Sequence, residues 1–167
     1  ESMMIKPRAG LTMSAAPKRG KTRATQAQAL RGAFEDLERY LREMVQRKKD
    51  GSDFDRREAR YQGREIEGED AKGRPLQSSA WKIDGFELVP RGEVDEKRAP
   101  LLAVIEGRMH AFIWCATPLD VHTALGVAEA NGFTANTTLA LGNSCWTAVD
   151  KIKAAGVSVL LEPNLVH

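Results

Sequence analysis

The last third of the chain alternates short apolar runs with single helical patterns, and this alternation limits the fold more than any other feature. The apolar runs are 110–115, 136–141 and 157–161, and helical spacing is found at 117–130 and 143–155. Antiparallel strands can be joined by a short turn, whereas parallel strands need a helical crossover to return to the same edge of the sheet. The sequence therefore predicts an α/β fold with parallel strands.

Residues that favour helix ends lie at the boundaries of these segments. Thr117 is a good N-cap for the first helix, and Gly132 supplies the left-handed residue that ends it. The second helix is expected to begin at Gly142 or Asn143 and to end at Gly156. Three strands with two crossover helices are too few to be covered on both faces, so this unit is expected to be a piece of a larger fold.

One long amphipathic helix is predicted in the first half of the chain, over 21–49. It is expected to begin at Thr22 or Thr25, with Thr25 and Gln28 as a capping box, and to end at 48–51. Its apolar residues recur every three or four positions: Leu30, Phe34, Leu37, Leu41 and Met44 or Val45. The single stripe favours packing within the chain, with pairing to a partner helix as the alternative.

The remaining segments are less regular. Residues 1–20 are predicted to be irregular, with at most one strand at 2–6. Residues 50–92 alternate charges and have few apolar side chains to bury, so they are predicted to form a charged insertion loop or a partly disordered segment. The most that this insertion is expected to contain is a short hairpin at 81–89. Residues 93–167 are assigned to the β/α repeats, beginning with a short helix at 97–106.

Composition excludes several classes of function. The chain has 25 basic and 23 acidic residues and a net charge of +2, which argues against a dedicated nucleic-acid binder. No apolar run reaches the length of a membrane span, so no membrane partner is expected. The sequence begins at Glu1, so the compartment stays open between the cytoplasm and, with a leader before Glu1, a secreted or periplasmic location. Cys115 and Cys145 are too few for a disulfide framework and are expected to be small buried side chains.

Several runs in the second half of the chain carry a family resemblance: 107–113, 120–125, 131–133, 148–152 and 155–161. Together they resemble the imidazolonepropionase-like branch of the metal-dependent amidohydrolases, over 90–166 and less clearly over 1–45. The resemblance implies a segment of a distorted (β/α)8 TIM barrel, the rest of which is missing from this chain. It also implies that the full protein hydrolyses C–N bonds of amides or cyclic amides, using water activated by zinc or iron.

The chain departs from that family at the metal site. In the family, the strand matching 110–115 and the next strand each end in a metal-binding histidine. The matching positions here are Trp114 or Ala116 on the first strand and Leu141 on the second, and none of these side chains can coordinate a metal. This segment is therefore expected to hold no metal itself, and Trp114 is expected to fill the space of an absent ion.

In parallel α/β folds the chemistry lies at the carboxyl ends of the strands. The candidate rim residues on this basis are Cys115, Thr117, Asn143, Ser144 and Glu162. The backbone of 142–144 could hold an anion, although ordinary helix capping explains the same residues. Cys145, in the first turn of the predicted helix, could be a thiol of lowered pKa, but no histidine is placed as its base. His110, His122 and His167 are too scattered to form a joint site.

Two other functions remain open from the sequence. One is an amidohydrolase-like barrel that has lost its metal and serves as a binding or structural protein. The other is a small doubly wound domain that binds an anion at 142–144. A small-molecule substrate is expected for the hydrolase, and a homo-oligomer is compatible with all three.

Overall fold

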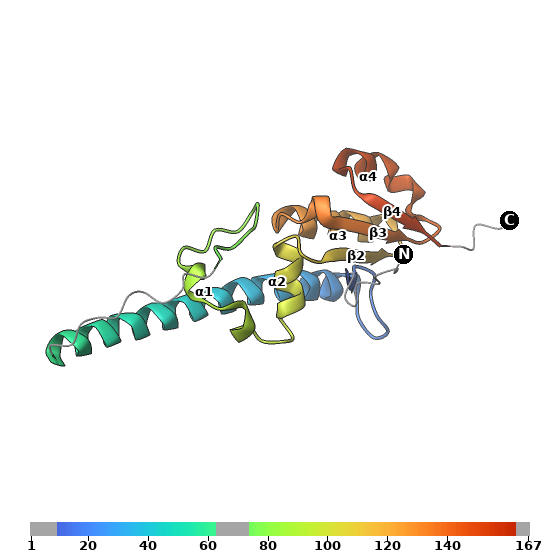
Figure 1. Ribbon diagram of the computed structural model, residues 1–167. Helices are drawn as coiled ribbons and strands as arrows, with labels where there is room; N and C mark the ends of the chain where they lie inside the picture. Colours follow the sequence, from blue (N-terminus) through green and yellow to red (C-terminus); the bar gives the residue numbers. More distant parts are fainter. Residues whose placement is uncertain (1–9, 63–73, 163–167) are drawn as a thin grey trace, which may run out of the picture.

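Four parallel strands form the centre of the protein, as a computed structural model covering residues 10–62 and 74–162 shows (Figure 1). They lie in the order β1-β2-β3-β4, with every neighbouring pair parallel. Their bounds are β1 Gly10–Ser14, β2 His110–Cys115, β3 Thr137–Leu141 and β4 Ser158–Leu161. The predicted α/β fold with parallel strands is confirmed. The irregular assignment of 1–20 is wrong at β1, and the strand proposed at 2–6 lies outside the described residues.

Helices connect each strand to the next. The α-helices are α1 Arg23–Gln62, α2 Ala99–Ile105, α3 Pro118–Ala130 and α4 Val149–Ala155. Short 3-10 turns are η1 Phe86–Leu88, η2 Arg91–Glu93, η3 Thr134–Asn136 and η4 Cys145–Ala148. Within residues 10–62 and 74–162, no helix combines the length and apolar character needed to cross a membrane.

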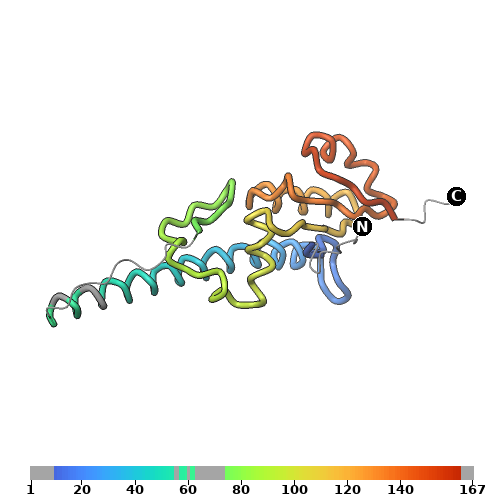
Figure 2. Tube along the Cα trace, in the orientation of Figure 1, coloured from blue at the N-terminus to red at the C-terminus, as the bar shows by residue number. Residues whose placement is uncertain are grey.

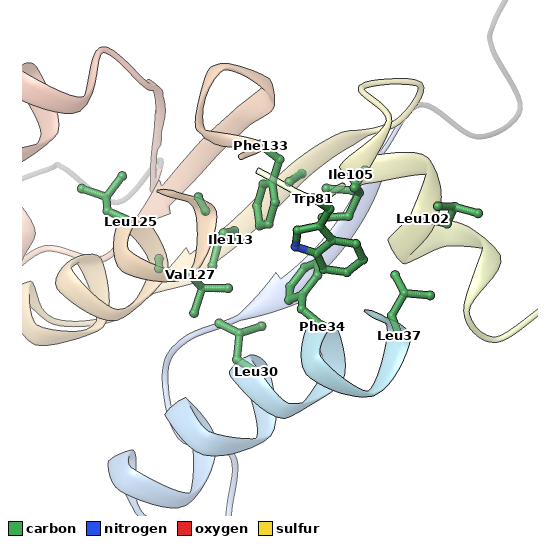
Figure 3. Close-up of a cluster of buried hydrophobic side chains, with 14 of the residues drawn as sticks. Leu30, Phe34, Leu37, Trp81, Leu102, Ile105, Ile113, Leu125, Val127 and Phe133 are labelled. Carbon is green, nitrogen blue, oxygen red and sulfur yellow. The ribbon is translucent and has the colours of Figure 1, made fainter. Parts of the chain in front are cut away.

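The sheet is covered by helices on one face. On β2, Ala111, Ile113 and Cys115 are fully buried, whereas the alternate residues, from His110 to Trp114, are only half-buried. The buried side packs against α1 and α3, where the Phe34 and Phe133 rings stack with centroids 5.1 Å apart (Figure 3). A helix-covered outer face and an open inner face are what a segment of a (β/α)8 barrel presents.

The open inner face has one close contact near its amino end. Gly10 of β1 lies beside the Phe112 ring of β2, and a Cβ built on Gly10 would be 2.5 Å from Phe112 Cε2. The His110 and Phe112 rings lie 5.0 Å apart on the same face. Gly10 therefore leaves the space that the Phe112 ring occupies, and any side chain at position 10 would clash with this ring.

Helix α1 begins after Thr22, the first of the two predicted caps, and ends later than the sequence predicted. The Thr22 Oγ1 accepts the backbone N–H of Thr25 at 3.2 Å, so Thr22 is the cap and the proposed Thr25–Gln28 box is wrong. The helix also continues through Gly51 to Gln62 and projects beyond the sheet (Figures 1 and 2). A single glycine costs a helix only about 1 kcal/mol, which is too little to stop it alone. The expected packing within the chain is confirmed by the burial of Phe34, Leu37 and Leu41.

The second part of the predicted insertion is ordered and packed. Trp81, Ile83, Phe86 and Val89 are all buried and belong to the same hydrophobic core as Phe34 and Leu37 of α1. Figure 3 shows Trp81 within this cluster. The Trp81 Nε1 donates to Asn131 Oδ1 at 3.1 Å. Of the two predicted alternatives for 74–92, partial disorder is wrong and an insertion loop agrees with the structure. The proposed hairpin is replaced by an irregular chain with the η1 turn and the start of η2. Residues 63–73 lie outside the described part.

A buried carboxylate ties this segment to the end of α2. The Glu106 side chain is only 2% exposed and accepts hydrogen bonds from Arg91 Nη2 at 2.7 Å and from Arg108 Nε at 2.8 Å. The Arg91 guanidinium also lies 4.1 Å from the centroid of Phe86 and donates to the Arg74 carbonyl. Arg91 therefore contacts three parts of the crossover from β1 to β2: the end of α2, the η1 turn and the irregular chain at Arg74.

Substituting Arg91→Ala should lower the free energy of unfolding by about 3 kcal/mol, because it leaves the buried Glu106 carboxylate with Arg108 alone. Urea denaturation monitored by circular dichroism measures this loss. Lys48→Ala is the control, since the Lys48–Glu93 ion pair is exposed and should contribute less than about 1 kcal/mol. Equal losses in the two variants would contradict the role given to Arg91.

Candidate functional site at the carboxyl ends of the strands

The carboxyl ends of the strands share one edge of the sheet because all four strands are parallel. The structure places all five predicted rim residues there, each at or just after the end of a strand: Cys115, Thr117, Asn143, Ser144 and Glu162. Helices α1 and α3 also begin at this edge. The local geometry decides which of these groups remain free for chemistry.

Thr117 is engaged in capping α3. Its backbone N–H and its Oγ1 both donate to Asp120 Oδ2 at 2.9 Å, which closes a capping box. Asp120 is itself 2% exposed, and its Oδ1 lies 3.5 Å from Arg23 Nε on α1. The Asp120 carboxylate therefore fixes the start of α3 and ties it to the start of α1. The Thr-x-x-Asp spacing from Thr117 to Asp120 is the sequence signal for this role.

Gln26 makes the corresponding link at the end of β1. This side chain is 8% exposed, and its Nε2 donates to the Ser14 carbonyl at 2.8 Å. Its Oε1 is buried without a hydrogen-bond partner among the described residues. This contact has no signal in the sequence, because Gln26 lies within an ordinary helical pattern.

The turn at 142–144 is held by its own backbone. Gly142 N–H donates to the Cys115 carbonyl at 2.8 Å, and Ser144 Oγ donates to the Ala116 carbonyl at 3.0 Å. A Cβ on Gly142 would lie 3.0 Å from the Ala116 oxygen, so this approach favours glycine. The α-helix begins only at Val149, after η4, and the predicted helix start at Gly142 or Asn143 is wrong. These contacts favour a structural turn over an anion site.

The two cysteines are packed side chains. Cys145 Sγ donates to the Cys115 carbonyl at 3.2 Å, and both residues are buried. Burial raises the pKa of the Cys115 thiol to about 12, and burial likewise raises the pKa of Cys145. A reactive thiolate needs the opposite shift, so the hypothesis of a catalytic Cys145 with a lowered pKa is wrong.

The two positions proposed for lost metal ligands face opposite ways. Trp114 pairs with Ala140 on β3, whereas Leu141 pairs with Cys115. Because side chains alternate along a strand, Trp114 faces the open inner side and Leu141 the helix-covered side. The expectation that Trp114 and Leu141 share one metal site is therefore wrong. Ala116 lies past the end of β2, where its carbonyl supports the 142–144 turn.

The residues at this edge do not fit a zinc or iron ion. The inner-face residues at the strand ends are Ser14, Trp114, Ala140 and Leu160. Among the described residues, no three His, Cys, Asp or Glu side chains gather closely enough to hold a metal. His110 lies at the opposite end of β2, bonded to Asn136 and Thr138, and His122 is exposed on α3. His167 lies outside the described part.

Comparisons with known proteins give one structural likeness. No protein-family profile and no curated protein sequence matches the chain. An amidohydrolase from Thermotoga maritima has a similar solved structure, with a TM-score of 0.56 at 17% sequence identity. The match covers 98% of this chain and only 35% of that one. The likeness shows the fold: the chain is folded as a partial (β/α)8 barrel of the kind found in an amidohydrolase.

Raising the pH above 9 should destabilise the protein through Cys115. The thiol has a pKa of about 12 when folded, against 9.0 for the ordinary group, so the native state keeps a proton that the unfolded chain loses. The stabilising contribution is present below pH 9 and is lost as the pH rises toward 12. Urea unfolding at stepped pH values should give a steeper decline for the unaltered protein than for Cys115→Ala. Parallel declines would contradict this assignment.

Proposed function

We propose that this chain forms part of the wall of an amidohydrolase-type barrel that hydrolyses C–N bonds of amides or cyclic amides. One observation carries the proposal: nearly the whole chain, 98%, overlays part of an amidohydrolase, and its sheet is covered on the outer face only. Barrels of this kind act on small molecules at the carboxyl ends of their strands. The carboxyl edge of the four described strands would contribute lining side chains and the 142–144 turn to such a site, and not metal ligands.

The finer assignment to the imidazolonepropionase-like branch rests on the sequence runs 107–113, 120–125, 131–133, 148–152 and 155–161. Membership of this branch would make a cyclic amide the substrate. Any zinc or iron would be held by residues outside the part of the chain that the structure describes, and its chemistry would be the activation of water. Trp114, half-buried on the inner face at the strand ends, is the side chain best placed to contact a bound ring.

A second candidate is a metal-free relative that binds a small molecule without hydrolysing it. This candidate is favoured by the apolar character of the inner edge, where Trp114 is flanked by Ala140 and then Leu160. An aromatic and two aliphatic groups give a surface for apolar contact but no acid, base or ligand at those positions.

Metal content and hydrolysis, measured on the protein at its natural length, test the two candidates. The hydrolase should retain close to one zinc or iron ion per barrel, and a chelator should abolish its turnover of cyclic amides while added metal restores it. Less than about one ion in ten chains, together with no turnover, would exclude the hydrolase and leave the binding protein. A matched apo sample reloaded with magnesium serves as the control for nonspecific rescue.

A further inference from the structure

The projecting half of helix α1 carries a second stripe of side chains, which we name the outer stripe. It consists of Phe54, Arg57, Glu58 and Tyr61, whose spacing places all four on one side of the helix. All four are exposed, and the two aromatic residues are 66% and 94% exposed. Aromatic groups gathered on an exposed stripe indicate a contact surface.

The outer stripe lies opposite the face by which α1 packs within the chain. Leu41 and Ala59 are both buried and lie about five helical turns apart, so they share the inner face of the helix. Phe54 follows Leu41 by about three and a half turns, which places it on the other side. This half of α1 also projects beyond the sheet (Figure 1). Packing of the helix onto the sheet therefore leaves the outer stripe uncovered.

The charges at the centre of the outer stripe are complementary to themselves. Arg57 and Glu58 are adjacent, with Phe54 about one turn before them and Tyr61 about one turn after. Two such helices packed antiparallel, with the two-fold axis between positions 57 and 58, would place Arg57 against the partner's Glu58. Phe54 would then lie against the partner's Tyr61. The same two-fold axis would repeat both the ion pair and the aromatic pair.

The Glu58 carboxylate is suited to this ion pair. It accepts a hydrogen bond from Gln62 Nε2 at 3.0 Å through Oε1, on the same helix. A carboxylate has further acceptor positions, so a guanidinium from a second chain can bind without displacing this contact.

A parallel arrangement of the two helices would be unfavourable. It would bring Arg57 against the same residue of the other chain, and Glu58 likewise, so that like charges face each other. It would also bring the two folded bodies to the same end of the helix pair. Because α1 projects beyond the sheet, antiparallel helices carry the two bodies to opposite ends (Figure 2).

We propose that the outer stripe binds a second copy of this chain, through an antiparallel contact between the projecting halves of two α1 helices. The inference goes beyond the proposed function, because it depends on neither the metal nor the reaction. About two helical turns from each chain make a small interface, so the dimer should be weak, with a Kd on the order of 10 μM.

Charge exchange at positions 57 and 58 tests the proposal in the protein at its natural length. Arg57→Glu would bring carboxylates together at the two-fold axis and should raise the Kd of the dimer, measured by sedimentation velocity, by about tenfold or more. The double variant Arg57→Glu/Glu58→Arg restores the ion pairs in reverse, so its Kd should return to within about threefold of the original. Phe54→Ser should also weaken the dimer, because it removes both aromatic pairs.

Arg31→Glu is the matched control. It makes the same change of charge at an exposed position in the packed half of α1, so it should leave the Kd unchanged. Circular dichroism checks that the helical content of each variant equals that of the unaltered protein.

Weakening by Arg57→Glu together with recovery in the double variant supports the antiparallel contact. A protein that remains monomeric up to about 100 μM overturns it. A dimer that Arg57→Glu leaves unchanged, or that the double variant does not restore, overturns it in favour of an interface elsewhere. Neither turnover nor metal content is measured, so this result is independent of the proposed hydrolase.

Discussion

The parallel pairing of β2 with β1 on one side and β3 on the other is the constraint on which the rest of the structure depends. Each parallel neighbour requires a crossover on the same face of the sheet, and the crossovers cover that face with helices. Ala111, Ile113 and Cys115 are buried for this reason, and the alternate residues of β2 face the uncovered side. The one-sided burial of the sheet is a direct result of its strand direction.

The crossover from β1 to β2 is much longer than the others, because it contains α1, the ordered segment from Arg74 onward and α2. Such a connection has to be fixed at several points to keep the two strands in register. Gln26 holds the start of α1 against β1, and the Asp120 carboxylate joins α1 to α3. At the other end of the crossover, the ion pair between Glu106 and Arg91 holds the end of α2 against the irregular segment. The edge that would carry chemistry is therefore positioned by buried polar contacts.

The sequence predicted those parts of the fold that have a repeating pattern. Strands β2, β3 and β4 and helix α3 follow from apolar runs, Thr117 and Gly132. It missed β1, because Leu11 and Met13 are the only large apolar residues in five, and it misjudged 74–92. In that segment the apolar residues have neither helical nor strand spacing, so only the tertiary structure shows that four of them are buried: Trp81, Ile83, Phe86 and Val89. At the candidate site, the sequence predicted which residues lie at the carboxyl edge of the sheet. It did not predict that Trp114 and Leu141 lie on opposite faces, because this depends on the register between β2 and β3.

The contact between Gly10 and the Phe112 ring has a consequence for the barrel interior. With only hydrogen at position 10, the edge of the Phe112 ring occupies the space that a Cβ of residue 10 would need. Any larger residue there would require the ring or the β1 backbone to shift. The residue at the first position of one strand therefore decides which aromatic side chain its neighbour can place on the open face.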